Sequence, residues 1–262
     1  MTSLDLYQYG AGILCGSLVG FALGLLGGGG SILAVPLLVH VVGVANVHVA
    51  IATSAVSVAA NALVGLLMHA RRGTVIWRYA GLYCATGMAG ALLGAFIGKK
   101  LDGDRLLLGF SALMMVIAIT MFRRIAVASG NTVSFVGRNA PKVLMAGAAT
   151  GAVSGFFGIG GGFLIVPGLV LTTGMPTINA VSTSLVAIVA FGLTTATTYA
   201  LSGLVDWPLA ATFIAGGAIG AVSGCHAVHR LRAHQSMLNK LLAAAILIVA
   251  LAMAWAETSK AA

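Results

Sequence analysis

The sequence predicts an all-α polytopic membrane protein built from two homologous repeats, each with a glycine-interrupted helical pair followed by three spans. Three observations predict this fold. Apolar residues make up 60% of the 262 residues and charged residues only 7%, whereas a soluble domain has about 25% charged residues. The apolar runs are long enough for α-helical spans, and short alternating segments typical of an outer-membrane barrel are not visible. The third observation is a glycine-rich segment that occurs twice.

This segment, GLLGGGGSILAVP at residues 24–36, recurs as GFFGIGGGFLIVP at residues 155–167, with seven of thirteen positions identical. One residue is lost in the next loop, and the offset between the halves then stays at 130. Pairs matched at this offset are Thr53-Ser54 with Thr183-Ser184, Gly73 with Gly203, Trp77 with Trp207, Gly87, Gly90 and Gly94 with Gly217, Gly220 and Gly224, and Leu101 with Leu231. One register kept this long indicates an intragenic duplication, with repeats at 1–122 and 143–262 around a polar connecting loop at 123–142.

Helices are predicted, with ends good to about 2–4 residues, over the apolar stretches 10–26, 31–44, 49–70, 79–98, 106–122, 143–157, 163–175, 180–202, 207–228 and 238–256. The first two stretches of each half are shorter than the ~20 residues that cross a bilayer. Each such pair fits either one long broken helix that crosses once or a hairpin of two short helices with its tip inside the membrane.

The positive charges help to choose between these arrangements. The net charge of +9 comes from Lys and Arg in short loops beside apolar runs, where they act as topology anchors rather than as nucleic-acid contacts. If each pair crosses once, the repeats are parallel and the basic residues show no bias. If each pair enters and leaves on one side, the repeats are inverted, and ten basic residues lie opposite four. The positive-inside rule favours this inverted arrangement, with loops 71–78 and 123–142 in the cytoplasm and loops 99–105 and 203–206 outside.

The sequence offers no constellation for catalysis or metal binding. The five acidic residues all fall at chain ends or in loops, so a carboxylate-based cation site and paired-carboxylate catalysis have no candidates. Cys15, Cys84 and Cys225 stand singly, without metal spacing or a disulfide framework. We therefore predict no catalytic residue, metal or cofactor.

The N-terminus has no basic residue before its first apolar stretch, so we expect that stretch to be retained rather than cleaved as a signal peptide. Residues expected to lie in membrane interfaces or packed are His40, His48, His69, Trp77 and Trp207.

The paired glycine clusters are the strongest candidates for a binding site. Glycine permits positive φ and close approach of another group, and irregular backbone at membrane depth is tolerated only when it is buried in protein or faces a watery cavity. Each cluster is followed by an apparent helix start, whose free amides and positive dipole end suit an anion. Half-helices of this kind at an inverted-repeat interface form the central site of many secondary transporters. The alternative is that the glycines only permit close helix packing, which is favoured for Gly87/Gly90/Gly94 and Gly217/Gly220/Gly224.

Hydroxyl and amide side chains could complete such a site. Thr53-Ser54 and Thr183-Ser184 recur at matching places and could donate to an anion, or could equally bond backbone within or between helices. Asn61 lies on the same helix face as Thr53, and its counterpart Phe191 is apolar, so any role of Asn61 is asymmetric.

Two copies of G-x-x-G-x-G-G-G/S-x-L-x-V-P, each followed by A-x-x-T-S, resemble the TauE/SafE family of sulfite exporter-like membrane proteins. The resemblance covers both halves and implies a multi-pass transporter of small anions, such as sulfite or organosulfonates, in a bacterial-type inner membrane. The positions that match the family pattern are Gly27, Gly29, Gly30, Pro36, Thr53 and Ser54, and Gly158, Gly160, Gly161, Gly162, Pro167, Thr183 and Ser184. The chain departs from the pattern at Gly28, where the second copy has Ile159, and at Ser31, opposite Gly162.

The sequence therefore predicts a secondary transporter, an exporter in the leading hypothesis, with the lipid bilayer and a small anion as its partners. The predicted substrate-binding residues are Gly27, Gly29, Gly30, Ser31, Thr53, Ser54, Asn61, Gly158, Gly160, Gly161, Gly162, Thr183 and Ser184. A channel-like anion pore of the same fold is the alternative, and a membrane-embedded enzyme is a third hypothesis that lacks a nucleophile–base pair. The substrate, the coupling ion, the direction and a homo-oligomeric state are left open.

Overall fold

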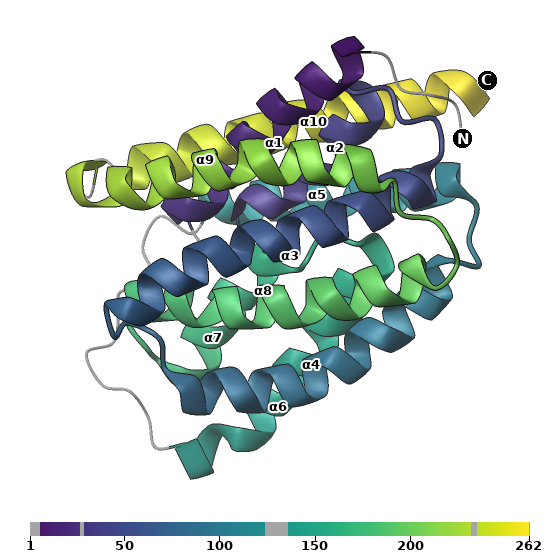
Figure 1. Cartoon of the computed structure of the whole chain (residues 1–262). Helices are drawn as coiled ribbons and strands as arrows, with labels where there is room; N and C mark the ends of the chain where they lie inside the picture. Colours follow the sequence, from purple (N-terminus) through teal and green to yellow (C-terminus); the bar gives the residue numbers. More distant parts are fainter. Residues whose placement is uncertain (1–5, 27–28, 124–135, 232–234, 262) are drawn as a thin grey trace.

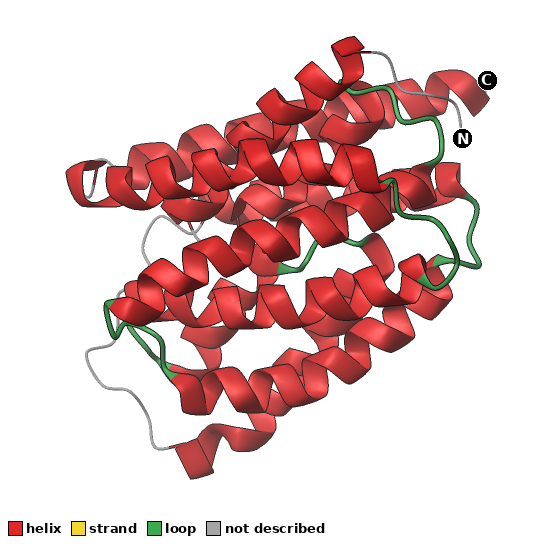
Figure 2. Ribbon diagram, viewed as in Figure 1, coloured by secondary structure: helices red, strands yellow, loops and turns green. Residues whose placement is uncertain are grey.

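The computed structural model describes residues 6–26, 29–123, 136–231 and 235–261. This part of the chain is helical with short connections and contains no strand (Figure 2). The first half forms α1 Leu6–Leu26, the 3₁₀ helix η1 Gly29–Leu33, α2 Ala34–His40, α3 Val47–Arg71, α4 Trp77–Gly98 and α5 Gly103–Arg123. The second half forms α6 Val136–Phe157, α7 Gly162–Thr173, α8 Thr177–Ala200, α9 Trp207–Leu231 and α10 Gln235–Ala261.

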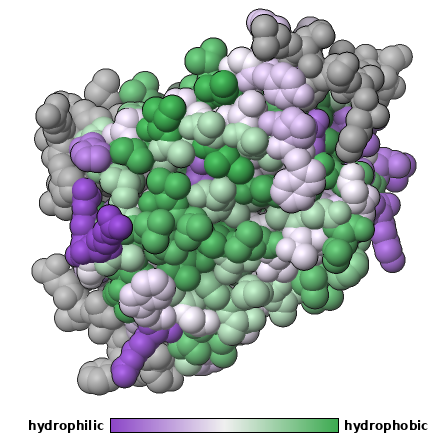
Figure 3. Space-filling model, in the orientation of Figure 1, coloured by the Kyte–Doolittle hydropathy of each residue, from purple (hydrophilic) through white to green (hydrophobic). Residues whose placement is uncertain are grey.

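Six of the described helices are long and apolar enough to cross a membrane, namely α1, α3, α4, α5, α8 and α9. A belt of apolar side chains covers the middle of the visible face, and hydrophilic side chains lie toward its two ends (Figure 3). The bundle therefore has the surface that a bilayer requires, with its helices running between two polar ends.

One correction concerns α6, which we expected at 143–157 and which begins at Val136, whereas α1, expected at 10–26, begins at Leu6, within the expected margin of about 2–4 residues. The two helices have 21 and 22 residues, enough in length to span. The residues added to α6 include Arg138, Asn139, Pro141 and Lys142, so hydropathy alone placed them outside the helix. The expected loop at 123–142 is correspondingly shorter, because α5 ends at Arg123 and residues 136–142 belong to α6. Residues 124–135 lie outside the described part.

Each glycine-interrupted pair is a hairpin, which was one of the two arrangements left open. At its base, Gln8 Nε2 near the start of α1 donates a hydrogen bond to the carbonyl of Val42, just after α2, over 3.0 Å. In the second pair α7 turns back along α6. Gly161 lies against Ser154, whereas Gly168 lies against the Tyr83 hydroxyl, which bonds Thr150 further back along α6. Each pair thus enters and leaves at one end of the bundle.

The two ends of the bundle differ in charge. We call one the Asp end; it holds loops 41–46, 99–102 and 201–206, with Asp102, Asp104 and Asp206 at or beside them together with Lys99, Lys100 and Arg105 (Figure 1). We call the other the Arg end; it holds loops 72–76 and 174–176, with Arg71, Arg72 and Arg78. Loops 72–76 and 201–206, which hold the matching Gly73 and Gly203, thus lie at opposite ends, whereas parallel repeats would place them at the same end.

The helices pack in pairs taken from both halves: α1 lies along α9, α4 along α6, and α5 along α10 (Figure 1). Between these pairs α3 packs on α8. These two spans are the most enclosed, with 72% and 67% of their residues buried over the most apolar window. The seam between α3 and α8 is therefore the centre of the protein.

Glycines allow close backbone contact between α4 and α6 and between α1 and α9. A Cβ at Gly90 or Gly94 of α4 would meet the α6 backbone at Ala148 or Ala152, and a Cβ at Gly220 of α9 would meet the α1 backbone at Ser17. Gly224 likewise faces Phe21. The prediction that these glycines permit close helix packing is confirmed, as small residues do at membrane helix contacts.

Candidate functional site

The second glycine cluster is a turn that only glycine adopts easily. Gly158, Gly160 and Gly161 have φ of +67°, +69° and +67°, in the left-handed region that disfavours residues with a Cβ. Ile159 between them is fully buried, and its amide donates to the carbonyl of Ser154 over 3.2 Å. Gly162 follows as the buried first residue of α7. The predicted positive-φ break is confirmed at this cluster.

This turn lies at the middle of the protein. A Cβ at Gly160 would stand 3.0 Å from Val58 of α3 and 3.1 Å from Ile188 of α8. Val58 and Ile188 each lie near the midpoint of their helix, so Gly160 sits at mid-depth in the α3–α8 seam. Ser54 of α3 ties the turn in place, because its hydroxyl donates to the carbonyl of Gly158 over 3.3 Å as well as to that of Ile51 over 2.8 Å.

The turn presents free hydrogen-bond donors. The carbonyl of Gly161 accepts from the amides of Leu164 and Ile165, which starts α7. The four preceding amides, of residues 160–163, have no acceptor within the described part of the chain. Two of them, of Gly162 and Phe163, are the first amides of α7, where the helix macrodipole adds partial positive charge. A buried site with such donors and without a basic side chain suits an anion.

Ser154 of α6 is the site residue that sequence reasoning missed. Its side chain is fully buried, and its hydroxyl has no hydrogen-bond partner among the described residues. The oxygen lies 3.1 Å from the position that a Cβ of Gly161 would take, so this hydroxyl faces the glycine turn. A buried polar atom without a partner costs about 1–3 kcal/mol and requires a reason. The sequence gives no signal for it, since a single serine in an apolar run is ordinary.

The first glycine cluster is built differently. Gly29, Gly30 and Ser31 are buried in η1, and neither glycine is among the described residues with positive φ. A Cβ at Gly30 would lie 2.6 Å from the amide nitrogen of Leu23 and 2.7 Å from the Ala22 side chain. Gly30 therefore permits close packing of the hairpin on α1. The η1 segment also contacts α7, so the two glycine segments meet. Gly27 and Gly28 lie outside the described residues.

The paired threonines bind backbone across the two halves. Thr53 Oγ1 accepts from the amide of Asp206 over 3.2 Å, and Thr183 Oγ1 accepts from the amide of Ile76 over 3.0 Å. Thr53 thereby holds the loop that leads into α9, and Thr183 holds the loop that leads into α4. Ser184 donates to the carbonyl of Val181 over 2.7 Å. These contacts give the hydroxyls backbone partners, and their assignment to an anion site stays a prediction.

Asn61 of α3 is fully buried, and both polar atoms of its side chain are without a partner in the described structure. It packs directly against Gly217 of α9, where no Cβ could be accommodated. Asn61 follows Val58 by one turn of α3, so it stands close to the level of Gly160. Its amide could both donate to an anion and accept from water.

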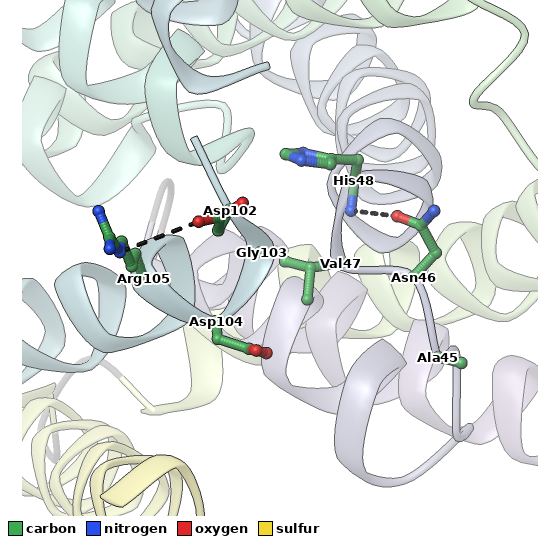
Figure 4. A pocket seen from close by; sticks show the side chains of 8 residues that line it. All are labelled: Ala45, Asn46, Val47, His48, Asp102, Gly103, Asp104 and Arg105. Atoms are coloured by element: carbon green, nitrogen blue, oxygen red, sulfur yellow. Dashed lines mark hydrogen bonds and ion pairs between the residues drawn. The ribbon is translucent and has the colours of Figure 1, made fainter. Parts of the chain in front are cut away.

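A polar pocket of ≈ 570 Å³ opens at the Asp end (Figure 4). It is lined by Ala45, Asn46, Val47, His48, Asp102, Gly103, Asp104 and Arg105. Asn46 caps α3 by accepting from the amides of His48 and Val49, and an exposed ion pair of 3.9 Å joins Arg105 to Asp102. Over the described residues, no group of three His, Cys, Asp or Glu side chains could hold a metal ion.

The fold and the site are those of a multi-pass helical membrane protein in which two glycine-interrupted hairpins meet, and the turn of the second lies between the two central spans. The sequence profile described as "Sulfite exporter TauE/SafE" matches residues 12–253, and this chain belongs to that family. The resemblance seen in the paired motifs is thus confirmed.

Curated relatives agree with this class. A "Probable membrane transporter protein" of Xylella fastidiosa is 50% identical over 241 residues, covering 92% of each chain. The "Probable membrane transporter protein YdhB" of Bacillus subtilis is 27% identical and covers 81% of this chain and 87% of its own. No solved structure matches the chain significantly. The protein is a membrane transporter of a bacterial-type membrane.

Proposed function

We propose that the protein is a secondary transporter that exports small anions, with sulfite or an organosulfonate as substrate, and that the anion binds at the α7 N-terminus. The observation that carries this proposal is the row of four free amides at residues 160–163, faced by the unpaired and buried hydroxyl of Ser154. Compact oxyanions accept several hydrogen bonds at once, and these unpaired amides and the neighbouring hydroxyl are donors that could supply them. The family membership supports an anion with a sulfur-oxygen group.

We further propose that the two halves are inverted repeats, as transporters with mid-membrane sites commonly have. Matching contacts support this. Thr53 with Asp206 and Thr183 with Ile76 are the same hydrogen bond at an offset of 130. A second pair of contacts matches at the same offset. Asn61 contacts Gly217 and its counterpart Phe191 contacts Gly87, the counterpart of Gly217.

A carrier is favoured over an open pore by the surroundings of the glycine turn. Val58 and Ile188 close on Gly160 from the two central helices, and the side chains of both are fully buried. An anion that approaches the turn through the α3–α8 seam needs these two helices to separate, which is the behaviour of a gated carrier rather than of a continuous channel.

The proposal is tested with purified protein in proteoliposomes. Uptake of sulfite, sulfate, methanesulfonate and acetate would be compared, each with and without a proton gradient. We expect saturable uptake of at least one sulfur oxyanion, and movement against its own gradient when protons drive it. Ser154→Ala, which removes one donor without steric conflict, should weaken sulfite binding about tenfold. The neighbouring Ser57→Ala should not, because that hydroxyl already donates to the carbonyl of Thr53. Uptake of none of the four anions would refute the function.

A further inference from the structure

Side-chain hydrogen bonds between α3 and α8 close their seam at the Arg end, whereas toward the Asp end, apart from the bond of Thr53 with the amide of Asp206, buried polar atoms of the seam are unpaired. At the Arg end, Ser182 of α8 bonds His69 of α3 over 3.0 Å, and Thr74 donates to Ser182 over 2.8 Å. Asn179 also donates to the carbonyl of Thr74 over 2.9 Å. Toward the Asp end, by contrast, the buried side chains of Thr195 and Tyr199 have polar atoms without a partner in the described structure.

These unpaired groups form a stripe that begins at the glycine turn. Thr195 and Tyr199 follow Ile188 by seven and eleven residues, so the three side chains share one face of α8. Ile188 touches Gly160 at the turn, and Gly192 on the same face lies against Ala55 and Ala59 of α3. The stripe therefore runs inside the α3–α8 seam, from mid-depth toward the Asp end. Thr195 and Tyr199 are both fully buried.

The stripe continues to the pocket at the Asp end. The rings of Tyr199 and His48 lie 6.3 Å apart between centroids. His48 has an unpaired Nδ1 atom and lines the open pocket, where Figure 4 shows it between α3 and the start of α5. The ammonium group of Lys99 stands 5.7 Å from the centroid of the Tyr199 ring. Lys99 therefore stands beside Tyr199, while the charged side chains that line the pocket itself are Asp102, Asp104 and Arg105.

We propose that Ser154, Thr195, Tyr199 and His48 line the route that joins the glycine turn to the Asp end, and that this route is closed in the present conformation. Buried polar atoms are normally satisfied. Four such groups in a row become satisfied if water and the passing anion line them when α3 and α8 move apart. The paired groups at the Arg end form the opposite closure. This inference rests on the proposed transport function. It adds the path that the anion follows and the end of the bundle at which this path opens.

Labelling of single cysteines tests the path without any substrate. In a background that lacks Cys15, Cys84 and Cys225, Thr195→Cys and Ser154→Cys are near-isosteric and should fold. We expect a membrane-impermeant maleimide to label both when it is added on the side where the exposed Asp102→Cys is labelled. The matched control is Thr198→Cys. Thr198 is also nearly buried in α8, but its hydroxyl donates to the carbonyl of Thr194, and it faces α4 in an apolar groove. Its labelling should be at least about tenfold slower.

Two results would overturn the route. One is that Thr195→Cys and Ser154→Cys are labelled only when the reagent is added on the Arg side, and the other is that they are labelled no faster than Thr198→Cys.

A transport assay distinguishes a wrong route from a wrong function. Thr195→Val should reduce sulfite flux at least about tenfold while sulfite affinity and folding are kept, because a donor of the path is lost and no native bond is broken. Thr198→Val should keep flux within about twofold, since its bond lies within its own helix. If wild-type protein moves no sulfite but Thr195→Cys is still labelled, the function fails and the water path stands. If wild-type flux is normal and Thr195→Val does not reduce it, the route is wrong.

Discussion

Thr183 of α8 accepts a hydrogen bond from the backbone amide of Ile76, 107 residues earlier in the chain, over 3.0 Å. A side chain of the second half thus fixes the loop that turns the first half from α3 into α4. Thr53 repeats the arrangement with the amide of Asp206. These two bonds anchor both connecting loops to the central helices, one at each end of the bundle.

Replacing Thr183 by Val should therefore destabilise the fold by about 1–3 kcal/mol, because the amide of Ile76 loses its acceptor in a partly buried place. Thermal unfolding in detergent measures this effect. Thr197→Val is the control, since its hydroxyl donates only to the carbonyl of Leu193 in the same helix. Equal stabilities of the two variants would contradict the anchoring role.

The two loops at residues 72 and 102 should be accessible from opposite sides of the membrane. In a cysteine-free background, Arg72→Cys should react with an impermeant thiol reagent from the cytoplasmic side and Asp102→Cys from the outside, as the excess of basic residues at the Arg end predicts. Inside-out and right-side-out vesicles provide both exposures. Labelling of both positions from one side would defeat the inverted arrangement.

Adding a side chain should have different effects at a glycine of the turn and at a glycine of the helix contacts. Gly161→Val should abolish transport, because φ is positive there and a Cβ would come within 2.8 Å of Ser154. Gly90→Ala should mainly lower stability, because its Cβ would meet the α6 backbone. Transport per correctly inserted protein is the quantity to compare, beside the unfolding temperature.

Gly81→Ala supplies the neutral control for that series, since nothing lies within 4 Å of the added Cβ and the residue is inside a helix. It should be neutral or stabilise by about 0.4–1 kcal/mol. Near-normal flux and sulfite affinity in a well-inserted Gly161→Val protein would show that the turn is a packing device.

Asn61→Leu should leave the fold as stable as wild type or more stable, because it removes two unpaired polar atoms whose burial costs about 1–3 kcal/mol. If Asn61 belongs to the site, sulfite affinity should nevertheless fall. Calorimetric binding and thermal unfolding on the same preparations separate the two effects. Unchanged affinity together with unchanged flux would remove Asn61 from the site.

The transported species should be an anion. Asp102, Asp104 and Asp206 all lie at the Asp end, and the buried polar residues of the described structure include no carboxylate. A cation site would then depend on backbone carbonyls and neutral side-chain oxygens. Proteoliposomes that move sodium without any anion would overturn this prediction.

The sequence was sufficient for the class, the helix order and the place of the glycine breaks, because apolar runs and glycine clusters are local signals. It misplaced the start of α6, where a polar first segment continues an apolar helix. It left the crossing of each pair open, because only a distant contact such as that of Gln8 with Val42 shows that a hairpin closes.

The site was predictable only in part, for a similar reason. The positive φ of Gly158, Gly160 and Gly161 follows from residue type. The same motif in the first half packs Gly30 on α1 without positive φ, and this difference depends on what surrounds each copy. Ser154 depends wholly on tertiary structure, since one hydroxyl in an apolar run has no distinguishing neighbour in the sequence.

The pairing of α1 with α9 also bears on how the protein is made. Gly24 and Cys225 lie in contact although they are 201 positions apart. During synthesis α1 enters the bilayer long before α9, and its glycine face must remain against lipid or a provisional neighbour until α9 is inserted. Domains generally fold as units as they emerge, but here neither half completes its own packing. Assembly must therefore wait until α9 has been made, and a product truncated before α9 would expose that bare helix face to membrane quality control.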